Sequence, residues 1–151
     1  MSIKINWTEK MKFEGEQNGD VVRMDAKTPI GDSRGYTPKE LVVLGAAGCS
    51  AMDVAALMKK HKQEMTAFSV ETDYQLTKTN PSIFSELRIT YDLAGKIDPA
   101  LALEAARLSQ TKYCGVSAMI SVTCPIFYKV IVNGEQVGEG KSEFNLKEIV
   151  G

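Results

Sequence analysis

The chain has 151 residues, of which 44% are hydrophobic and 25% are charged, so it has the size and composition of one soluble globular domain rather than of a disordered chain. Its 18 lysines and arginines nearly balance its 19 aspartates and glutamates, which argues against nucleic acid or an anionic membrane surface as a partner. An odd count of three cysteines argues against a disulfide framework, and a single histidine excludes zinc sites built on several histidines. We therefore expect a single domain over residues 1–151 in a reducing cytoplasm.

The most apolar segment, Leu41–Met58, is interrupted by Ser50, Asp53 and several small residues. A membrane-spanning helix needs roughly 18 or more clean apolar positions. The first residues, Met1–Lys4, alternate charge and hydrophobe and do not form the apolar core of a signal peptide. We expect no membrane span.

The N-terminal part of the chain alternates in hydropathy, which is typical of β-strands. Strands are expected at Ile3–Trp7, at Met11–Phe13 and at Val21–Asp25. The second should lead into a turn-rich segment, Gly15–Asp20. Lys27–Tyr36, which contains two glycines and a proline, should be a loop.

A long helix should follow this loop. Thr37 is expected as the N-cap, with Pro38 at the first helical position and Glu40 completing a capping box. The helix body, Leu41–Met58, is apolar on nearly every face. Such a helix is expected to be buried all round, inside a core or against a second subunit.

Strands are again expected in the second half of the chain, at Phe68–Leu76, Leu87–Leu93 and Ile126–Val132. The last of them should end at the Asn133-Gly134 turn, and the polar tail from Glu135 is left unassigned. Segregated strands with two principal helices predict an α+β fold with antiparallel sheets and a long buried central helix.

The second of those helices should be capped by Asp98, with Pro99 at its first position. Its register leads toward Cys114, and Gly115 should stop it. A thiolate at a helix C-terminus faces the unfavourable end of the helix dipole. Cys114 is therefore expected to be the less acidic thiol.

Cys49 lies within the central helix and Cys114 lies 65 positions later, so only the fold could bring them together. One interpretation is that both are small core hydrophobes, because free cysteine is often buried. The other is a redox pair. Cys124, just before Pro125, is expected to be structural.

Three segments, Thr37–Leu41, Gly48–Asp53 and Lys112–Val116, resemble the OsmC/Ohr family, and the resemblance extends from the first strands to about Val132. It implies an intertwined homodimer with two active sites at its interface and thiol-dependent reduction of hydroperoxides without a cofactor or metal. By motif, Cys49 matches the cysteine that peroxide attacks and Cys114 matches the resolving cysteine.

The sequence departs from the organic-hydroperoxide branch of that family at the groups that activate the reactive cysteine. Lys39 stands where that branch has a glutamate, and Glu40 is one position late. The segment Gly15–Asp20 contains no arginine, so Arg34, just ahead of the helix, is the nearest substitute to assist Cys49. The alternative is that Arg34 is an ordinary solvated loop charge, and Arg23, in a strand, is a poorer candidate. Asp53, on the same helix face as Cys49, would raise the pKa of the neighbouring thiol. The sequence therefore resembles an uncharacterised OsmC-like branch more than either of the well-understood branches.

The leading functional hypothesis is an antioxidant thiol peroxidase that acts on organic hydroperoxides or hydrogen peroxide through a Cys49–Cys114 disulfide. A small dithiol or a thioredoxin-like protein would reduce the disulfide. Two alternatives stay open. One is a non-catalytic protein that binds an apolar ligand in the same interface pocket, and the other is a redox sensor that forms the disulfide without turnover.

Overall fold

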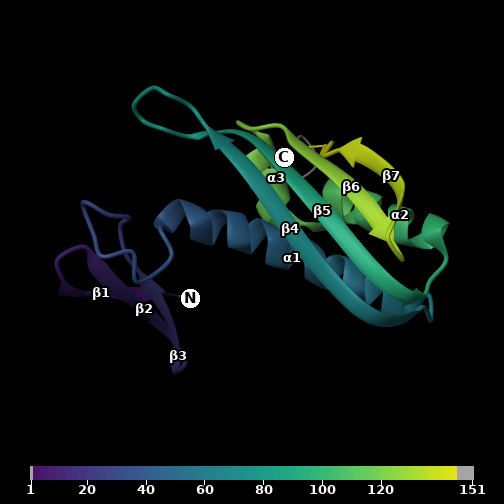
Figure 1. The fold of residues 1–151 in the computed structure, drawn as a ribbon, viewed down its shortest axis with the longest axis horizontal. Coiled ribbons are helices and arrows are strands. Elements are labelled where there is room, and N and C mark those ends of the chain that lie inside the picture. Colours follow the sequence, from purple (N-terminus) through teal and green to yellow (C-terminus); the bar gives the residue numbers. More distant parts are fainter. Residues whose placement is uncertain (1, 146–151) are drawn as a thin grey trace. The chain divides into compact units, whose positions relative to one another are not determined.

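The structure is a computed structural model that describes residues 2–145 (Figure 1). The chain divides into two compact units, Met1–Val43 and Leu44–Gly151. Each unit is built on its own β-sheet, and α1 (Pro38–Lys60) begins in the first unit and continues into the second. The prediction of one domain over residues 1–151 stays a prediction.

The N-terminal unit contains a three-stranded antiparallel sheet made of β1 (Lys4–Glu9), β2 (Lys12–Gln17) and β3 (Asp20–Met24). The three predicted strands are thereby confirmed. The expected turn at Gly15–Asp20 is wrong over its first half, because residues 15–17 continue β2 and pair with β3. The turn itself is confined to Asn18 and Gly19, which both have positive φ angles.

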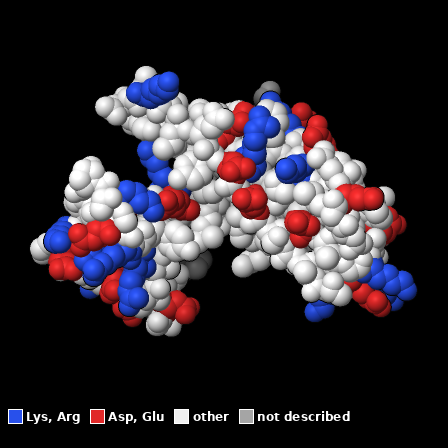
Figure 2. Space-filling view, in the orientation of Figure 1, with Lys and Arg blue, Asp and Glu red and all other residues white. Residues whose placement is uncertain are grey.

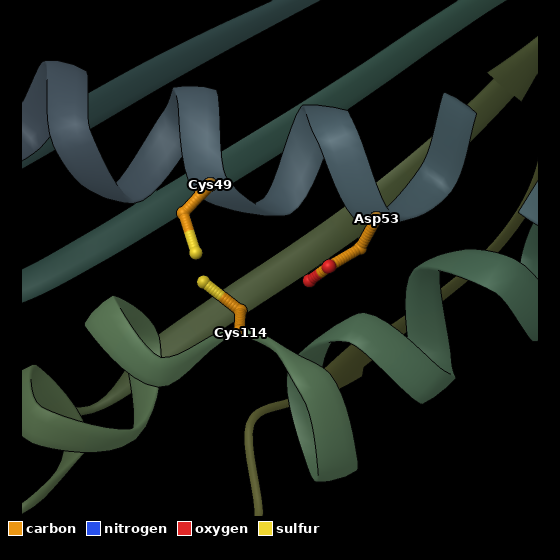
Figure 3. A group of neighbouring side chains, drawn as sticks. All are labelled: Cys49, Asp53 and Cys114. Atoms are coloured by element: carbon orange, nitrogen blue, oxygen red, sulfur yellow. The ribbon is translucent and has the colours of Figure 1, made fainter. Parts of the chain in front are cut away.

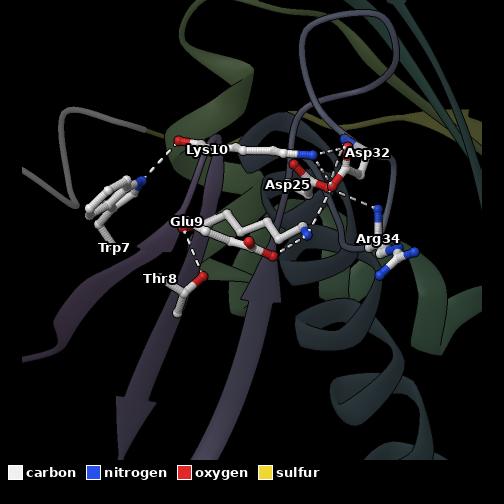
Figure 4. A network of polar contacts seen from close by, with 8 residues as sticks. Trp7, Thr8, Glu9, Lys10, Asp25, Asp32 and Arg34 are labelled. Carbon is white, nitrogen blue, oxygen red and sulfur yellow. Dashed lines mark hydrogen bonds and ion pairs between the residues drawn. The ribbon is translucent and has the colours of Figure 1, made fainter.

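The buried carboxylate of Asp25 holds the loop that follows β3 in place. Oδ2 of Asp25, a residue only 2% exposed, accepts hydrogen bonds from the backbone N–H groups of Asp32 and Arg34 (Figure 4). Lys10 and Lys12 form ion pairs with Asp32 at 3.2 and 2.9 Å. The loop predicted over residues 27–36 is therefore confirmed; Asp25 binds its backbone, and the two lysines bind the Asp32 side chain.

Helix α1 starts as its capping box predicts. The Thr37 hydroxyl accepts from the Glu40 N–H at 3.3 Å, and the Glu40 carboxylate accepts from the Thr37 N–H at 2.7 Å. The single chain does not bury this helix all round, so burial against a second subunit stays a prediction. The core face of α1, which includes Val54, is buried, whereas Leu44 is 50% and Met52 74% exposed. The apolar residues of α1 follow one another without a helical period, so the sequence does not indicate which faces of the helix pack against the rest of the chain.

By length and composition alone, α1 is also long and apolar enough to cross a membrane, with a mean hydropathy of 1.9 over an 18-residue window. It is the one such helix in the part of the chain that the structure describes. A core helix passes the same test, and Ala46, Val54 and Met58 of α1 lie in the core of the C-terminal unit. The predicted absence of a membrane span stays a prediction.

The C-terminal unit has a four-stranded mixed sheet in the order β4 (Glu64–Leu76), β5 (Phe84–Lys96), β6 (Ile126–Val132) and β7 (Glu135–Lys141). β5 and β6 pair in parallel, and the other two pairs are antiparallel. Alternate residues of β5 and β6 are buried, so one face of the sheet packs against helices. The predicted α+β class is confirmed, with one mixed sheet in place of purely antiparallel ones.

Strand β7 falls in the tail that the sequence left unassigned. Its sequence is mostly polar and contains Gly138 and Gly140, and polar residues and glycine both lower strand propensity. These glycines allow close approach of neighbouring side chains, because a Cβ on Gly138 would come within 2.5 Å of Leu103, and one on Gly140 within 2.5 Å of Tyr128. Only the tertiary packing therefore explains a strand here.

Three short helical segments connect β5 to β6. α2 (Pro99–Leu108) starts as predicted, since Asp98 accepts from the Ala100 N–H at 2.9 Å. A π-helical segment (Ser109–Tyr113) follows, and α3 (Gly115–Ser121) comes next. The prediction that Gly115 stops a helix is wrong, because Gly115 begins one. Ala102, Ala105 and Ala106 of α2 pack into the same core as α1.

Acidic and basic side chains are interspersed on the face of the molecule shown in Figure 2. Among the described residues, Arg88 pairs with Glu86 and Arg107 pairs with Glu104, both at 2.6 Å. This mixed distribution agrees with the near-neutral composition and gives that face no single-sign patch of the kind that binds nucleic acid.

Candidate active site

Three side chains converge in the C-terminal unit: Cys49 and Asp53 from α1, and Cys114 from the junction between the π-helical segment and α3. Their two sulfurs and a carboxylate oxygen all lie within 4.8 Å of one another. Figure 3 shows the two sulfurs pointing toward each other, with the Asp53 carboxylate directed at the same space. The fold thus brings together two thiols that are 65 positions apart.

Helical geometry explains why Asp53 joins the pair. It follows Cys49 by four positions, so both side chains project from the same face of α1 one turn apart. The predicted proximity of Asp53 to the thiol is confirmed. Cys49 is partly exposed, whereas Cys114 is fully buried. Of the two cysteines, Cys49 is therefore the one more open to solvent in the single chain.

Cys114 is the N-cap of α3 rather than the end of the preceding helix, which corrects the sequence prediction. Its sulfur accepts a hydrogen bond from the Ser117 N–H at 3.3 Å, and its own N–H donates to the Ser109 carbonyl oxygen at 2.9 Å. Burial nevertheless raises the pKa of the Cys114 thiol to about 11, and the contacts with Ser117 only partly oppose this shift. The expectation that Cys114 is a weakly acidic thiol agrees with this value, but the cause is desolvation and not a helix C-terminus.

Asp53 is half-buried and has one fixed partner. The Ser109 hydroxyl donates to its Oδ2 at 2.9 Å. Burial raises the pKa of the Asp53 carboxyl above its ordinary value, and the hydrogen bond from Ser109 acts in the opposite direction. The result is a carboxylate held beside two thiols with one oxygen engaged by Ser109.

A buried polar network supports the π-helical segment that precedes Cys114. Gln110, which is fully buried, donates through Nε2 to the Tyr91 hydroxyl at 2.8 Å and accepts from the Ser142 hydroxyl at 2.6 Å. Desolvation raises the pKa of Tyr91 to about 12, so Tyr91 stays protonated at neutral pH. The network ties β5 and the end of β7 to the segment that positions Cys114.

The third predicted site residue, Arg34, lies in the loop of the N-terminal unit, where it is exposed and its backbone N–H bonds Asp25. Its role in assisting Cys49 stays a prediction. Cys124 is buried and lies in the core cluster, as expected for a structural cysteine. Sequence reasoning missed Ser109 and Gln110, because no local motif marks them. Ser109 bonds Asp53, which is 56 positions away, and Gln110 bonds Tyr91, which is 19 positions away.

Comparison with known proteins agrees with this architecture. Residues 31–129 match the family model described as OsmC-like protein. The chain is 30% identical over 122 residues to protein YhfA of Escherichia coli K12, which covers 80% of this chain and 89% of that protein.

Solved structures share the fold. A hypothetical protein from Aquifex aeolicus superposes with a TM-score of 0.75 at 24% identity, covering 87% of this chain and 96% of the other. The organic hydroperoxide resistance protein OhrB of Bacillus subtilis superposes with a TM-score of 0.63 at 15% identity, covering 88% and 98%. On the strength of the matched family model and the E. coli relative, the chain belongs to the OsmC-like family.

Proposed function

We propose that this protein reduces hydroperoxides by forming and breaking a Cys49–Cys114 disulfide. The observation that carries the proposal is the convergence of the two sulfurs within 4.8 Å in the folded chain. Membership of the OsmC-like family supports it, since an OhrB structure with the same fold is that of an organic hydroperoxide resistance protein. A bonded S–S distance is about 2.05 Å, so the two sulfurs approach each other further when the disulfide forms.

The reaction has three steps. The Cys49 thiolate attacks the terminal peroxide oxygen, the O–O bond breaks, and the alkoxide leaves as an alcohol after taking a proton. Cys49 is then a sulfenic acid. The Cys114 sulfur attacks the Cys49 sulfur and expels water, which forms the disulfide. An external dithiol supplies two electrons and two protons and restores both thiols.

Asp53 is the group in this cluster that would carry the protons. Its carboxylate lies within 4.8 Å of both sulfurs, and its raised pKa makes it a stronger base than an ordinary aspartate. It would accept the Cys49 proton before attack and return a proton to the leaving alkoxide. If the Asp53 carboxylate only repelled the Cys49 thiolate, it would slow peroxide reduction. The effect of Asp53 on the rate of peroxide reduction therefore distinguishes a proton carrier from a repelling charge.

The proposal includes a homodimer in a reducing cytoplasm, with a small dithiol or a thioredoxin-like protein as the reductant. Large apolar side chains are exposed in the single chain on the two helices next to the cysteine pair in sequence, among them Met52 of α1 at 74% and Met119 of α3 at 68%. A second copy covering this face would bury them. Light scattering at several protein concentrations tests the dimer, and Met52→Lys should weaken it.

The first test is the mass and free-thiol count of the reduced protein after brief exposure to an organic hydroperoxide, with hydrogen peroxide in parallel. We expect one disulfide per chain, mapped by peptide analysis to Cys49 and Cys114. Cys49→Ser should abolish this reaction, and Cys124→Ser should leave it unchanged because Cys124 lies in the core cluster, apart from the pair.

Two results would overturn the proposal. Both thiols could stay free after peroxide treatment, in which case the ligand-binding alternative would take its place. The disulfide could instead form without being reduced by dithiothreitol or thioredoxin at a rate that sustains turnover, and the redox-sensor alternative would then account for the cysteine pair.

A further inference from the structure

We propose that the reduced protein binds a thiophilic divalent cation, Zn²⁺ in particular, through Cys49, Asp53 and Cys114. This would be a second use of the cluster, distinct from peroxide reduction. It rests on the geometry of the three side chains and does not require the proposed peroxidase activity. The cluster supplies two sulfurs and one carboxylate oxygen, all within 4.8 Å of one another.

The donor set fits zinc. Thiolate sulfur and carboxylate oxygen are both ordinary zinc ligands, at about 2.3 Å and 2.0–2.2 Å from the ion. Two sulfurs on a tetrahedral zinc therefore lie about 3.8 Å apart. Since the ligand atoms already lie within 4.8 Å of one another, each pair needs to close by at most about 1 Å to reach the spacing of a tetrahedral zinc site. Rotation of the side chains supplies such a movement. Harder cations such as Mg²⁺ prefer all-oxygen sites.

The chain also fixes the orientation of the ligands. Cys49 and Asp53 are one helical turn apart on α1, so two of the three ligands are held at a fixed spacing by one rigid helix. The Ser109 hydroxyl donates to Oδ2 of Asp53, and no other residue that the structure describes forms a hydrogen bond with this carboxylate, so Oδ1 can bind the cation. Hydrogen bonds of this kind to a ligating carboxylate hold it in place and raise metal affinity. The Cys114 backbone is fixed by its N–H bond to the Ser109 carbonyl oxygen, so Ser109 positions two of the three ligands.

A bound cation would also offset the repulsion between the Asp53 carboxylate and the two thiolates. A carboxylate next to two sulfurs disfavours the thiolates when the site is empty. Binding replaces two thiol protons by one divalent ion, so two protons leave and no electron is transferred. Three protein ligands leave a fourth position open to water. Because a disulfide has no thiolate to offer, metal binding and the Cys49–Cys114 disulfide exclude each other.

The test uses the full-length reduced protein, freed of metal with a chelator and titrated anaerobically with Co²⁺ as a spectroscopic probe. Thiolate ligation gives intense sulfur-to-cobalt charge-transfer absorption in the near ultraviolet. We expect this band to saturate at one Co²⁺ per chain and to disappear when Zn²⁺ displaces the probe, because zinc is well suited to tetrahedral sites with thiolate ligands. Protein oxidised with diamide should show no band.

Variants assign the ligands. Cys49→Ser and Cys114→Ser should abolish the one-to-one charge-transfer band, and Cys124→Ser should keep it at full intensity. Asp53→Asn preserves shape and both thiols, so the band should remain while the Co²⁺ affinity falls at least about tenfold. The proposal would be wrong if wild-type protein gave no sulfur-to-cobalt band, or if Asp53→Asn bound Co²⁺ as tightly as wild type. Neither readout depends on peroxide turnover, so failure of one proposal leaves the other standing.

Discussion

The hydroxyl of Ser109 donates a 2.9 Å hydrogen bond to the carboxylate of Asp53 and so links α1 to the π-helical segment across 56 positions of sequence. This bond lowers the pKa of Asp53 against the effect of burial, which raises it. It also sets the direction of the only carboxylate in the Cys49–Asp53–Cys114 cluster. The relationship makes Ser109 a positioning residue for whatever chemistry the cluster performs.

Replacing Ser109 by Ala should therefore raise the pKa of Asp53 further and lower the free energy of unfolding by about 1 kcal/mol. NMR titration of the Asp53 carboxyl and urea unfolding measure the two effects. Ser121→Ala is the matched control, because within the described part of the chain the Ser121 hydroxyl bonds only the Ala118 carbonyl of its own helix. An unchanged or lower Asp53 pKa in Ser109→Ala would contradict the prediction.

Cys114→Ser should stop the proposed cycle after its first step. Cys49 would still react with peroxide, but its sulfenic acid would have no resolving thiol and would accumulate. Dimedone labelling followed by peptide mapping should find the adduct on Cys49. Absence of any adduct, with wild-type protein forming the disulfide under the same conditions, would mean that the order of attack is reversed and Cys114 reacts first.

The buried Cys114 thiol should titrate at high pH even without its partner thiol. In Cys49→Ser, thiolate absorbance assigned to Cys114 should rise only well above pH 9, the ordinary pKa from which burial shifts it. A raised folded-state pKa means that the unfolded chain loses this proton first. The contribution to stability is therefore complete below about pH 9 and declines as the pH rises toward 11. A midpoint at or below pH 9 would show that burial does not control this thiol.

The Tyr91–Gln110 hydrogen bond should contribute to stability because both partners are buried. Tyr91→Phe removes the hydroxyl and leaves Nε2 of Gln110 unpaired, which should cost about 1–3 kcal/mol of unfolding free energy. Combining it with Gln110→Leu should cost less than the sum of the two single changes. Urea unfolding at one fixed protein concentration measures the cycle, and full additivity would mean that the bond carries no coupling.

Gly95 should tolerate no side chain. It has a φ of +135°, and a Cβ there would collide with the backbone carbonyl oxygen of Glu64. Gly95→Ala should lower the free energy of unfolding by about 2–4 kcal/mol. Gly134→Ala is the control, because its φ is also positive but a Cβ would meet nothing within 4 Å, so it should cost only about 1 kcal/mol. Equal losses would mean that backbone strain alone, and not the collision, decides the effect.

The sequence by itself determined the features that depend on neighbours along the chain. The capping box of Thr37 and Glu40, the Asp98 cap and the alternation in β5 and β6 are local, because each is set by side chains within a few residues of the backbone they satisfy. The spacing of Cys49 and Asp53 also placed both on one helix face without any knowledge of the fold.

The tertiary structure decided everything that depends on distant partners. It brought Cys114 to Cys49, made Cys114 the start of α3, and gave Asp53 its bond to Ser109. It also made a strand of the glycine-containing β7 by pairing it with β6. The physical reason is the same in each case. Burial, and with it the pKa of a thiol or carboxyl, is set by groups that pack around a residue in space, and these groups lie tens of positions away in the sequence.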